Sequence, residues 1–459
     1  MAKYQKYAEY KDSGVDWLGE IPQKWSVWKL NHFAPIVTCG VAATPEYQDE
    51  GIPFLSAQNV KKKKIDLSKG YKFISTEKHE ELTRNRKPEK GDILLSRVGT
   101  IGEGCIVDVD FEFSIFVSLT HLRLIQKVCV NEFFIYLTES SYIKALHGAV
   151  TLVGGGVGNL NVNDLREYKL PIPSVSEQIQ IANFLDHETA KIDSLIEKQQ
   201  KLIELLKEKR QAVISHAVTK GLNPDVPMKD SGVEWLGQVP EHWEIPRLKQ
   251  LVRYGSSISY GIVQPGDALE EGVPFIQTTN ISKGSFKLED FQKTSASIES
   301  NYPRSRLEGG EVILGIRASI GAAFVVPMSF KGVNLSRGIA RILPIDFLSS
   351  DFLVWYFKSN AVDQYWGLSK QGSTFSEVSI ETVKELNVVI PPIKEQEAIS
   401  EFLLIQSDKF NNLIEAATSQ KQLLLERRTA LISAAVTGKI DVRNWQAPNA
   451  TEREMEVST

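Results

Sequence analysis

The chain has 459 residues, 42% of them hydrophobic and 24% charged, with a formal net charge of −4 at pH 7. This length predicts two to four domains, and the composition is typical of a soluble globular protein. No apolar run approaches the about 18 residues of a membrane span, and the first residues lack the apolar core of a signal peptide. Three scattered cysteines form neither a disulfide framework nor a zinc pattern. We therefore expect a cytoplasmic protein without a membrane partner.

The first element is a motif that occurs twice. Lys11–Pro22 recurs as Lys229–Pro240, displaced by 218 residues, and nine of the twelve positions are identical. Isolated glycines and prolines in the motif predict a turn-rich lead into each half of the chain. We expect tryptophan side chains to pin this lead onto the domain behind it. These tryptophans are Trp17, Trp25 and Trp28 in the first copy and Trp235 and Trp243 in the second.

Two further segments repeat at nearly the same displacement. Gly51–Val60 and Gly272–Ile281 each predict a short strand that runs into a polar loop. Gly91–Gly102 and Gly310–Gly321 each predict a buried strand, a turn of small residues that carries one arginine, and a second strand. The residues between these segments diverge strongly. The two halves therefore share a framework but not a surface.

A long helix follows each half. Glu177 to Val218 contains neither Gly nor Pro, and its hydrophobic residues recur every seven positions, which is typical of a coiled coil. The second helix, Glu395 to Val436, repeats this pattern in register. The expected seam of the first helix is Leu185, Ile192, Leu206 and Val213 at one position and Leu195 and Leu202 at the other, with Ile196 and Ile203 alongside. The corresponding seam of the second helix is Leu403, Phe410, Leu424 and Leu431, with Leu413 at the other position.

The expected fold class is α+β. Two globular α/β domains are related by a pseudo-twofold axis and joined by two long antiparallel coiled-coil helices. The expected segments are a first domain at 1–173, a first helix at 174–220, a second domain at 221–391, a second helix at 392–438 and a tail at 439–459.

No catalytic motif is present. The seven histidines do not form a metal-ligand pattern, and neither a nucleophile elbow, a P-loop nor a dinucleotide fingerprint occurs. We therefore expect no catalytic residue, no metal and no cofactor in this chain. The negative net charge counts against nucleic acid as a partner but does not exclude it, because binding depends on where the basic residues lie.

The binding candidates are basic and amide residues on the repeated loops. Lysine beside Asn and Gln suits phosphate contact combined with base-edge readout, and arginine suits paired hydrogen bonds to guanine or phosphate. Each residue is a weak signal alone, and a solvated loop would be the favoured explanation of the lysine run by itself; the signal is that both halves carry such residues on corresponding or neighbouring loops. In the first half the candidates are Gln58, Asn59, Lys61, Lys62, Lys63, Lys64, Arg97 and Thr100. In the second half they are Thr278, Thr279, Asn280, Arg304, Arg306, Arg317 and Ser319.

The chain resembles the DNA-specificity subunits of type I restriction-modification enzymes over nearly its whole length. The resemblance rests on Ser13–Pro22 and Ser231–Pro240, on the Pro-x-x-x-Glu-Gln motifs at Pro173–Gln178 and Pro391–Gln396, and on the helix ends near Thr219 and Thr437. It implies two target-recognition domains that read a bipartite, asymmetric site in double-stranded DNA, with the helices setting the spacer. It also implies two methylation subunits, which bring S-adenosylmethionine, and two restriction and translocase subunits, which bring ATP and Mg²⁺.

Two other classes remain open. The chain could be a non-catalytic coiled-coil scaffold with two globular protein-binding ends, which the negative charge favours and the repeated motif set disfavours. It could also be a nuclease or methyltransferase fused to its own reader, which the missing catalytic motifs disfavour.

Overall fold

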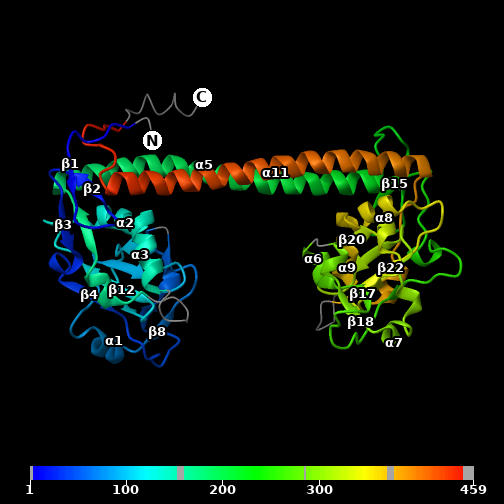
Figure 1. The fold of residues 1–459 in the computed structure, drawn as a ribbon, viewed down its shortest axis with the longest axis horizontal. Helices are drawn as coiled ribbons and strands as arrows, with labels where there is room; N and C mark the ends of the chain where they lie inside the picture. Colours follow the sequence, from blue (N-terminus) through cyan, green and yellow to red (C-terminus); the bar gives the residue numbers. More distant parts are fainter. Residues whose placement is uncertain (1–3, 62, 152–159, 284–285, 370–376, 448–459) are drawn as a thin grey trace. The chain divides into compact units, whose positions relative to one another are not determined.

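The computed structural model describes residues 4–61, 63–151, 160–283, 286–369 and 377–447. The chain divides into two compact units, 1–199 with 419–459, and 200–418. Helices α5 (Val175–Lys220) and α11 (Ile393–Val436) are each divided between the two units, so that each unit contains one part of both helices (Figure 1). None of the helices in the described ranges is long and apolar enough to cross a membrane.

The first unit is built on two small sheets. The four-stranded antiparallel sheet has the order β10-β9-β12-β4, and the three-stranded sheet has the order β11-β5-β8, with β11 parallel to β5. Seven of the nine residues of helix α2 (Asn131–Glu139) are buried, and its run Phe133–Leu137 shares a core with Leu95 and Leu122 of the first sheet. The strands of the first sheet are β4 (Ile36–Cys39), β9 (Ile93–Ser96), β10 (Gly104–Ile106) and β12 (Leu119–Arg123). Those of the second are β5 (Ile52–Leu55), β8 (Lys72–Ile74) and β11 (Ser114–Ile115).

The second unit repeats this topology. Its sheets have the orders β20-β19-β22-β16 and β21-β17-β18, again with one parallel pair, β17 with β21. The sequence prediction of a duplicated framework, with a strand–turn–strand at each Gly-rich repeat, is confirmed. The strands are β16 (Ser259–Tyr260), β17 (Val273–Ile276), β18 (Gln292–Thr294), β19 (Val312–Gly315), β20 (Ala323–Val325), β21 (Asn334–Leu335) and β22 (Ile339–Ile342).

The twice-occurring motif forms a β-hairpin in each unit. In the first, β1 (Tyr10–Asp12) pairs with β2 (Glu20–Pro22), and in the second, β14 (Met228–Asp230) pairs with β15 (Gln238–Pro240). Asp12 Oδ1 accepts a hydrogen bond from the Gly14 amide at 2.9 Å, and Asp230 repeats this contact at 3.0 Å. The two glycines of each copy have positive φ, a conformation that side chains with a Cβ disfavour. The motif is thus retained because it defines the hairpin.

The hairpin is held by a buried tryptophan. Trp25 and Trp243 are 1% and 0% exposed and belong to the cores that include the long helices. Trp28, in contrast, is 38% exposed, so the expectation that it anchors the lead was wrong. It lies in β3 (Ser26–Lys29), which pairs with β13 (Lys169–Ile172) and leaves one of its faces in solvent.

The Glu-Gln pair at the start of each long helix explains the second repeated motif. Gln178 is fully buried; its Nε2 donates to the carbonyls of Val128 (2.7 Å) and Pro173 (2.9 Å), and its Oε1 accepts from the Val130 amide (2.8 Å). Gln396 makes the same three contacts with Phe347, Pro391 and Ser349. Each glutamine therefore fixes the first turn of its helix to the domain, since a buried amide group must find hydrogen-bond partners.

The two long helices pack antiparallel. In the first unit the early part of α5 contributes Phe184 and Ile192 to the same core as Leu431 near the end of α11. In the second unit the late part of α5 shares a core with the early part of α11, through residues such as Val218 and Leu403. Arg428 of α11 also donates from Nε to Asp193 Oδ1 of α5 at 2.8 Å.

One half of the expected seam was wrong. Ile192 and Ile203 are 5% and 6% exposed, whereas Leu195 and Leu202 are 45% and 43% exposed, and Leu413 is 53% exposed. The heptad pattern gave one seam position correctly, but three- and four-residue steps from it lead to two adjacent stripes on the helix. Ile203 is buried, and Ile196 packs against the core that includes Leu424 of α11.

Replacement of Ile192 by alanine should lower the free energy of unfolding by about 2–5 kcal/mol, because it leaves a cavity in the helix pair. The matched change Leu195→Ala, three residues away, should cost less than about 1 kcal/mol. Denaturant unfolding of the purified chain measures both. Equal losses for the two variants would contradict the seam described above.

Candidate nucleic-acid interface

The polar loop of the first unit folds around a buried amide. Asn59, 1% exposed, accepts from the Ser56 amide (3.0 Å) and donates to the carbonyls of Asp66 (3.2 Å) and Gly70 (3.0 Å). Asn280 of the second unit has the corresponding place and accepts from the Gln277 amide at 2.8 Å. Both side chains shape their loops and have their amide groups occupied. Direct base contact by either residue is therefore disfavoured by its burial.

A two-stranded hairpin carries the lysine run. It consists of β6 (Val60–Lys61) and β7 (Lys64–Ile65), and the side chains of Lys61 and Lys64 are exposed. Gln58 is also exposed and donates to the Gly70 carbonyl at 3.2 Å. Lys62 lies outside the described residues. Two of the four lysines are thus placed where a phosphate could reach them.

Lys63 points inward. Its Nζ lies 3.1 Å from the ring centroid of Tyr136 in α2 and 4.0 Å from Asp186 Oδ1 in α5. Tyr136 donates its hydroxyl hydrogen to the same Asp186 at 2.5 Å. A positive φ of 65° at Lys63 makes the turn that directs its side chain this way. This lysine therefore attaches the hairpin to the helices.

The expected arginines on the strand–turn–strand repeats hold the backbone. Arg97 is 7% exposed and donates from Nε to the Leu160 carbonyl (2.6 Å) and from Nη1 to the Val117 carbonyl (3.1 Å). Its counterpart Arg317 forms an ion pair with Glu377. Leu160 and Glu377 directly follow 152–159 and 370–376, which are outside the described residues. Of the neighbouring candidates, Thr100 is exposed and Ser319 is partly buried.

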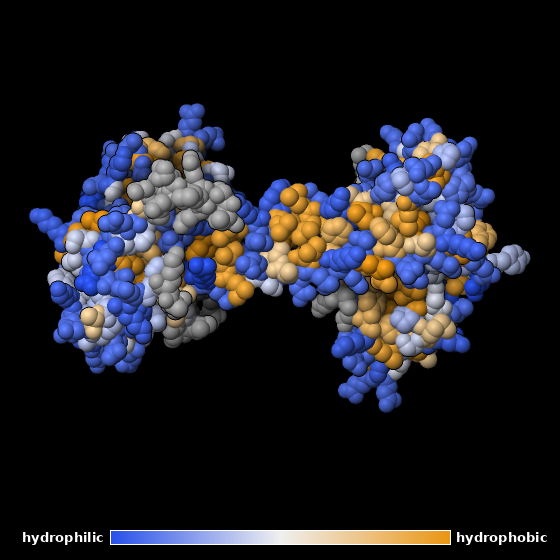
Figure 2. All heavy atoms as spheres, turned by 90° about the horizontal axis from the view of Figure 1, so that it is seen from above, coloured by the Kyte–Doolittle hydropathy of each residue, from blue (hydrophilic) through white to orange (hydrophobic). Residues whose placement is uncertain are grey.

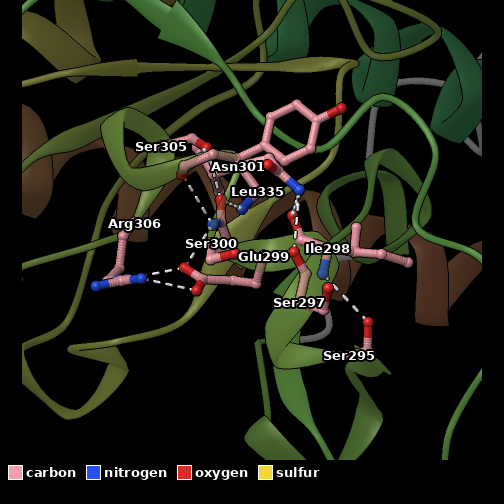
Figure 3. A network of polar contacts seen from close by, with 11 residues as sticks. Ser295, Ser297, Ile298, Glu299, Ser300, Asn301, Ser305, Arg306 and Leu335 are labelled. Carbon is pink, nitrogen blue, oxygen red and sulfur yellow. Dashed lines mark hydrogen bonds and ion pairs between the residues drawn. The ribbon is translucent and has the colours of Figure 1, made fainter.

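The basic turn of the second unit is exposed. It is a short 3-10 helix, η6 (Pro303–Ser305), and both Arg304 and Arg306 reach solvent. The Arg306 guanidinium forms two hydrogen bonds with the buried carboxylate of Glu299, at 2.8 and 2.7 Å (Figure 3). Thr279 is exposed and Thr278 partly buried on the neighbouring helix α6 (Thr278–Lys283).

Each unit contains a buried charged group that the sequence did not indicate. Asp92 accepts from His121 Nε2 (2.6 Å) and from Arg123 Nε (2.7 Å). Burial by itself would raise the pKa of Asp92, but the hydrogen bonds from Arg123 and His121 outweigh it and lower the pKa to about 2. In the second unit the corresponding pair is Glu311 with Arg341, at 3.0 Å. The pairing of strands far apart in sequence brings these groups together, so no local motif could reveal them.

The first unit also has a polar recess that the sequence did not indicate. Its volume is about 440 Å³, and its lining includes Thr38, Asn85 and Arg86, with Ser114 and His121 deeper inside. Arg86 corresponds to Arg306 of the second unit, at an offset of 220. The recess size is within the range of ligand sites, but its polar lining is unlike their mainly apolar walls. None of the described residues forms a cluster of metal ligands.

The pKa of Lys63 generates a prediction. Burial lowers it from 10.5 to about 8, against the opposing effects of Glu139 and Asp186. Between pH 8 and 10.5 the unfolded chain thus binds more protons at this lysine than the folded chain does, so its contribution to stability rises with pH. The free energy of unfolding of wild type relative to Lys63→Met should increase from pH 7.5 to 10 in denaturant titrations. A difference independent of pH would contradict the inward placement of Lys63.

Comparison with known proteins gives the family. The model described as type I restriction modification DNA specificity domain matches residues 22–205 and 240–425. The putative type I restriction enzyme MjaX specificity subunit of Methanocaldococcus jannaschii is 26% identical over 451 residues, covering 96% of this chain and 99% of the relative. The Escherichia coli type I restriction enzyme EcoBI specificity subunit is 26% identical over 413 residues, covering 84% and 86%.

A solved structure agrees with this at the level of the fold. A chain from a structure on complex assembly and conformational transition of the type I R-M system superposes with a TM-score of 0.63 at 19% identity, covering 91% of this chain and 98% of the other. The family model matches one segment in each half, and together these segments span most of the sequence. The chain therefore belongs to the type I restriction-modification DNA-specificity family.

Proposed function

We propose that this chain is the specificity subunit of a type I restriction-modification complex, in which each unit reads one part of a bipartite, asymmetric DNA site. The observation that carries the proposal is a framework that occurs twice with different side chains on its loops. A repeated framework presents two surfaces in the same way, and different side chains on those surfaces suit different base sequences.

The long helices set the unread spacer between the two parts of the site. Each helix is continuous through both units. A change in helix length therefore changes the separation of the two half-sites that the units can bind together. At about 1.5 Å per residue, helix length converts directly into distance along DNA.

The helices also dock the methylation subunits. Large hydrophobic side chains lie exposed along them, and Figure 2 shows such side chains gathered on their surface. Exposed apolar surface of this kind marks protein–protein contact. The residues are Ile179, Leu195, Leu202 and Leu205 of α5 and Ile393, Leu404, Ile405, Leu413, Leu423 and Leu425 of α11.

The chain is non-catalytic in this proposal. Two methylation subunits supply S-adenosylmethionine chemistry, and two restriction and translocase subunits supply ATP and Mg²⁺. This chain contributes DNA recognition and assembly.

The exposed lysines of the β6–β7 hairpin should contact phosphate. The double variant Lys61→Ala/Lys64→Ala should weaken DNA binding and reduce the slope of log affinity against log salt by up to about 2, since each phosphate contact contributes about 0.9. Binding of a duplex to the complex at several salt concentrations measures this slope.

Lys63→Met is the matched control, because the Lys63 ammonium group lies over the ring of Tyr136 and its side chain is only 28% exposed. It should leave the salt slope unchanged. A slope unaffected by the double variant, or lowered equally by the control, would remove this hairpin from the phosphate contacts.

A further inference from the structure

Hydrogen bonds to Asn334, Arg341 and Ser259 hold the basic turn of the second unit, Pro303–Ser305 with Arg306. Ser305 Oγ donates to Asn334 Oδ1 at 2.6 Å, and the Arg304 carbonyl accepts from Arg341 Nη1 and Ser259 Oγ, both at 3.2 Å. Pro303 at the first position of η6 further restricts the backbone. These contacts therefore hold the backbone that carries Arg304 and Arg306 in one conformation.

The side chain of Arg306 is oriented by a buried carboxylate. Glu299 is 4% exposed, and it accepts hydrogen bonds from Nε and Nη2 of Arg306 (Figure 3). It also accepts a hydrogen bond from Asn334 Nδ2 at 3.0 Å. The hydrogen bonds from Arg306 hold the pKa of Glu299 below its usual range, so the carboxylate stays ionised. Arg306 itself remains half exposed.

This arrangement leaves one edge of the guanidinium available. Of its five N–H donors, one on Nε and one on Nη2 point to Glu299, and the end formed by Nη1 and Nη2 keeps two parallel donors. Guanine offers O6 and N7 in the major groove at the matching spacing. The charge of Glu299 largely cancels that of Arg306, which weakens the attraction to phosphate but preserves directional hydrogen bonding.

Arg304 differs in this respect. Its side chain is exposed, and its only hydrogen bonds among the described residues are made by its backbone carbonyl. A guanidinium without a carboxylate partner keeps its full charge, which suits contact with phosphate. The turn thus carries two arginines, two residues apart, with different properties. Arg306 has an oriented guanidinium, and Arg304 retains its full charge.

The first unit does not repeat the pairing of an exposed arginine with a buried carboxylate. The positions that correspond to Glu299 and Asn334 are His79 and Ser114, whose side chains contact each other at 2.9 Å. Arg86, at the position of Arg306, is exposed beside the polar recess. Among the described residues, the arginine at this position thus has a carboxylate partner in the second half alone, as expected if the halves read different bases.

We infer that Arg306 reads a guanine in the half-site of the second unit, that Glu299 is its positioning residue, and that Arg304 contacts phosphate. This rests on the proposed function and names the chemical group that the second unit recognises.

The test maps methylated sites in cells that express the complete complex. Arg306→Lys keeps the charge next to Glu299 but lacks the paired donors, so the mapped motif should become degenerate at one G·C pair, with about 10- to 100-fold less discrimination there. The other half-site should stay fully defined. Glu299→Gln/Arg306→Ala, which leaves no buried unpaired carboxylate, should relax the same base pair.

Arg304→Ala is the contrasting variant. It should leave the motif unchanged and lower the salt slope of DNA binding by about 1, whereas Arg306→Lys should leave that slope unchanged. Glu299→Asp, which keeps the charge but withdraws the carboxylate, should relax the motif partly, an effect that mere loss of stability would not confine to one base pair.

A motif that stays fully defined in both Arg306 variants overturns the inference, as does relaxation spread over both half-sites. If the wild-type complex itself methylates no defined site, the proposed function fails. A defined wild-type motif with unaltered variants contradicts only the inference about Arg306.

Discussion

The packing of α5 against α11 is the constraint on which the rest of the structure depends. Each helix gives its first part to the core of one unit and its last part to the core of the other. Neither unit is complete without both helices, because Phe184 and Leu431 in one core, and Val218 and Leu403 in the other, come from segments far apart in sequence. Recognition domains and helices therefore cannot be varied independently where they meet.

The two halves agree at the contacts that fasten domain to helix and differ where they face outward. Gln178 and Gln396 make the same three hydrogen bonds, and Trp25 and Trp243 fill the same place in their cores. Beneath the outer loops, in contrast, His121 is replaced by Arg341 and His79 by Glu299. Buried pairs of different charge can support different surfaces on one framework. This pattern suits a protein whose halves share an assembly and read different sequences.

Much of the fold was accessible from the sequence, because repetition and periodicity are local properties. The duplicated framework, the two long helices and their antiparallel pairing are confirmed. The seam was half right, since a heptad pattern alone does not distinguish the Leu195 stripe from the adjacent Ile196 stripe when both are apolar. The hairpin formed by the repeated motif was not foreseen, because its Asp and Gly contacts depend on pairing across a loop.

The roles of the individual site residues could be predicted less well from the sequence. Asn59 and Arg97 carry the residue types of a DNA reader, yet they are buried and hold backbone carbonyls. Lys63 is one of four consecutive lysines, and only its positive φ and the position of Tyr136 direct it inward. Residue type gives chemical capability, but exposure and partners are set by contacts distant in sequence. The Glu299–Arg306 pair is of this kind.

The most direct test of the account lengthens both helices by one heptad, between 199 and 200 and between 418 and 419, where the two units divide. Seven residues add about 10 Å of helix, which corresponds to about three base pairs of DNA. Binding of the complex to duplexes that carry both half-sites with varied spacers should then show an optimum about three base pairs longer. An optimum unchanged from wild type would contradict the claim that the helices set the spacer.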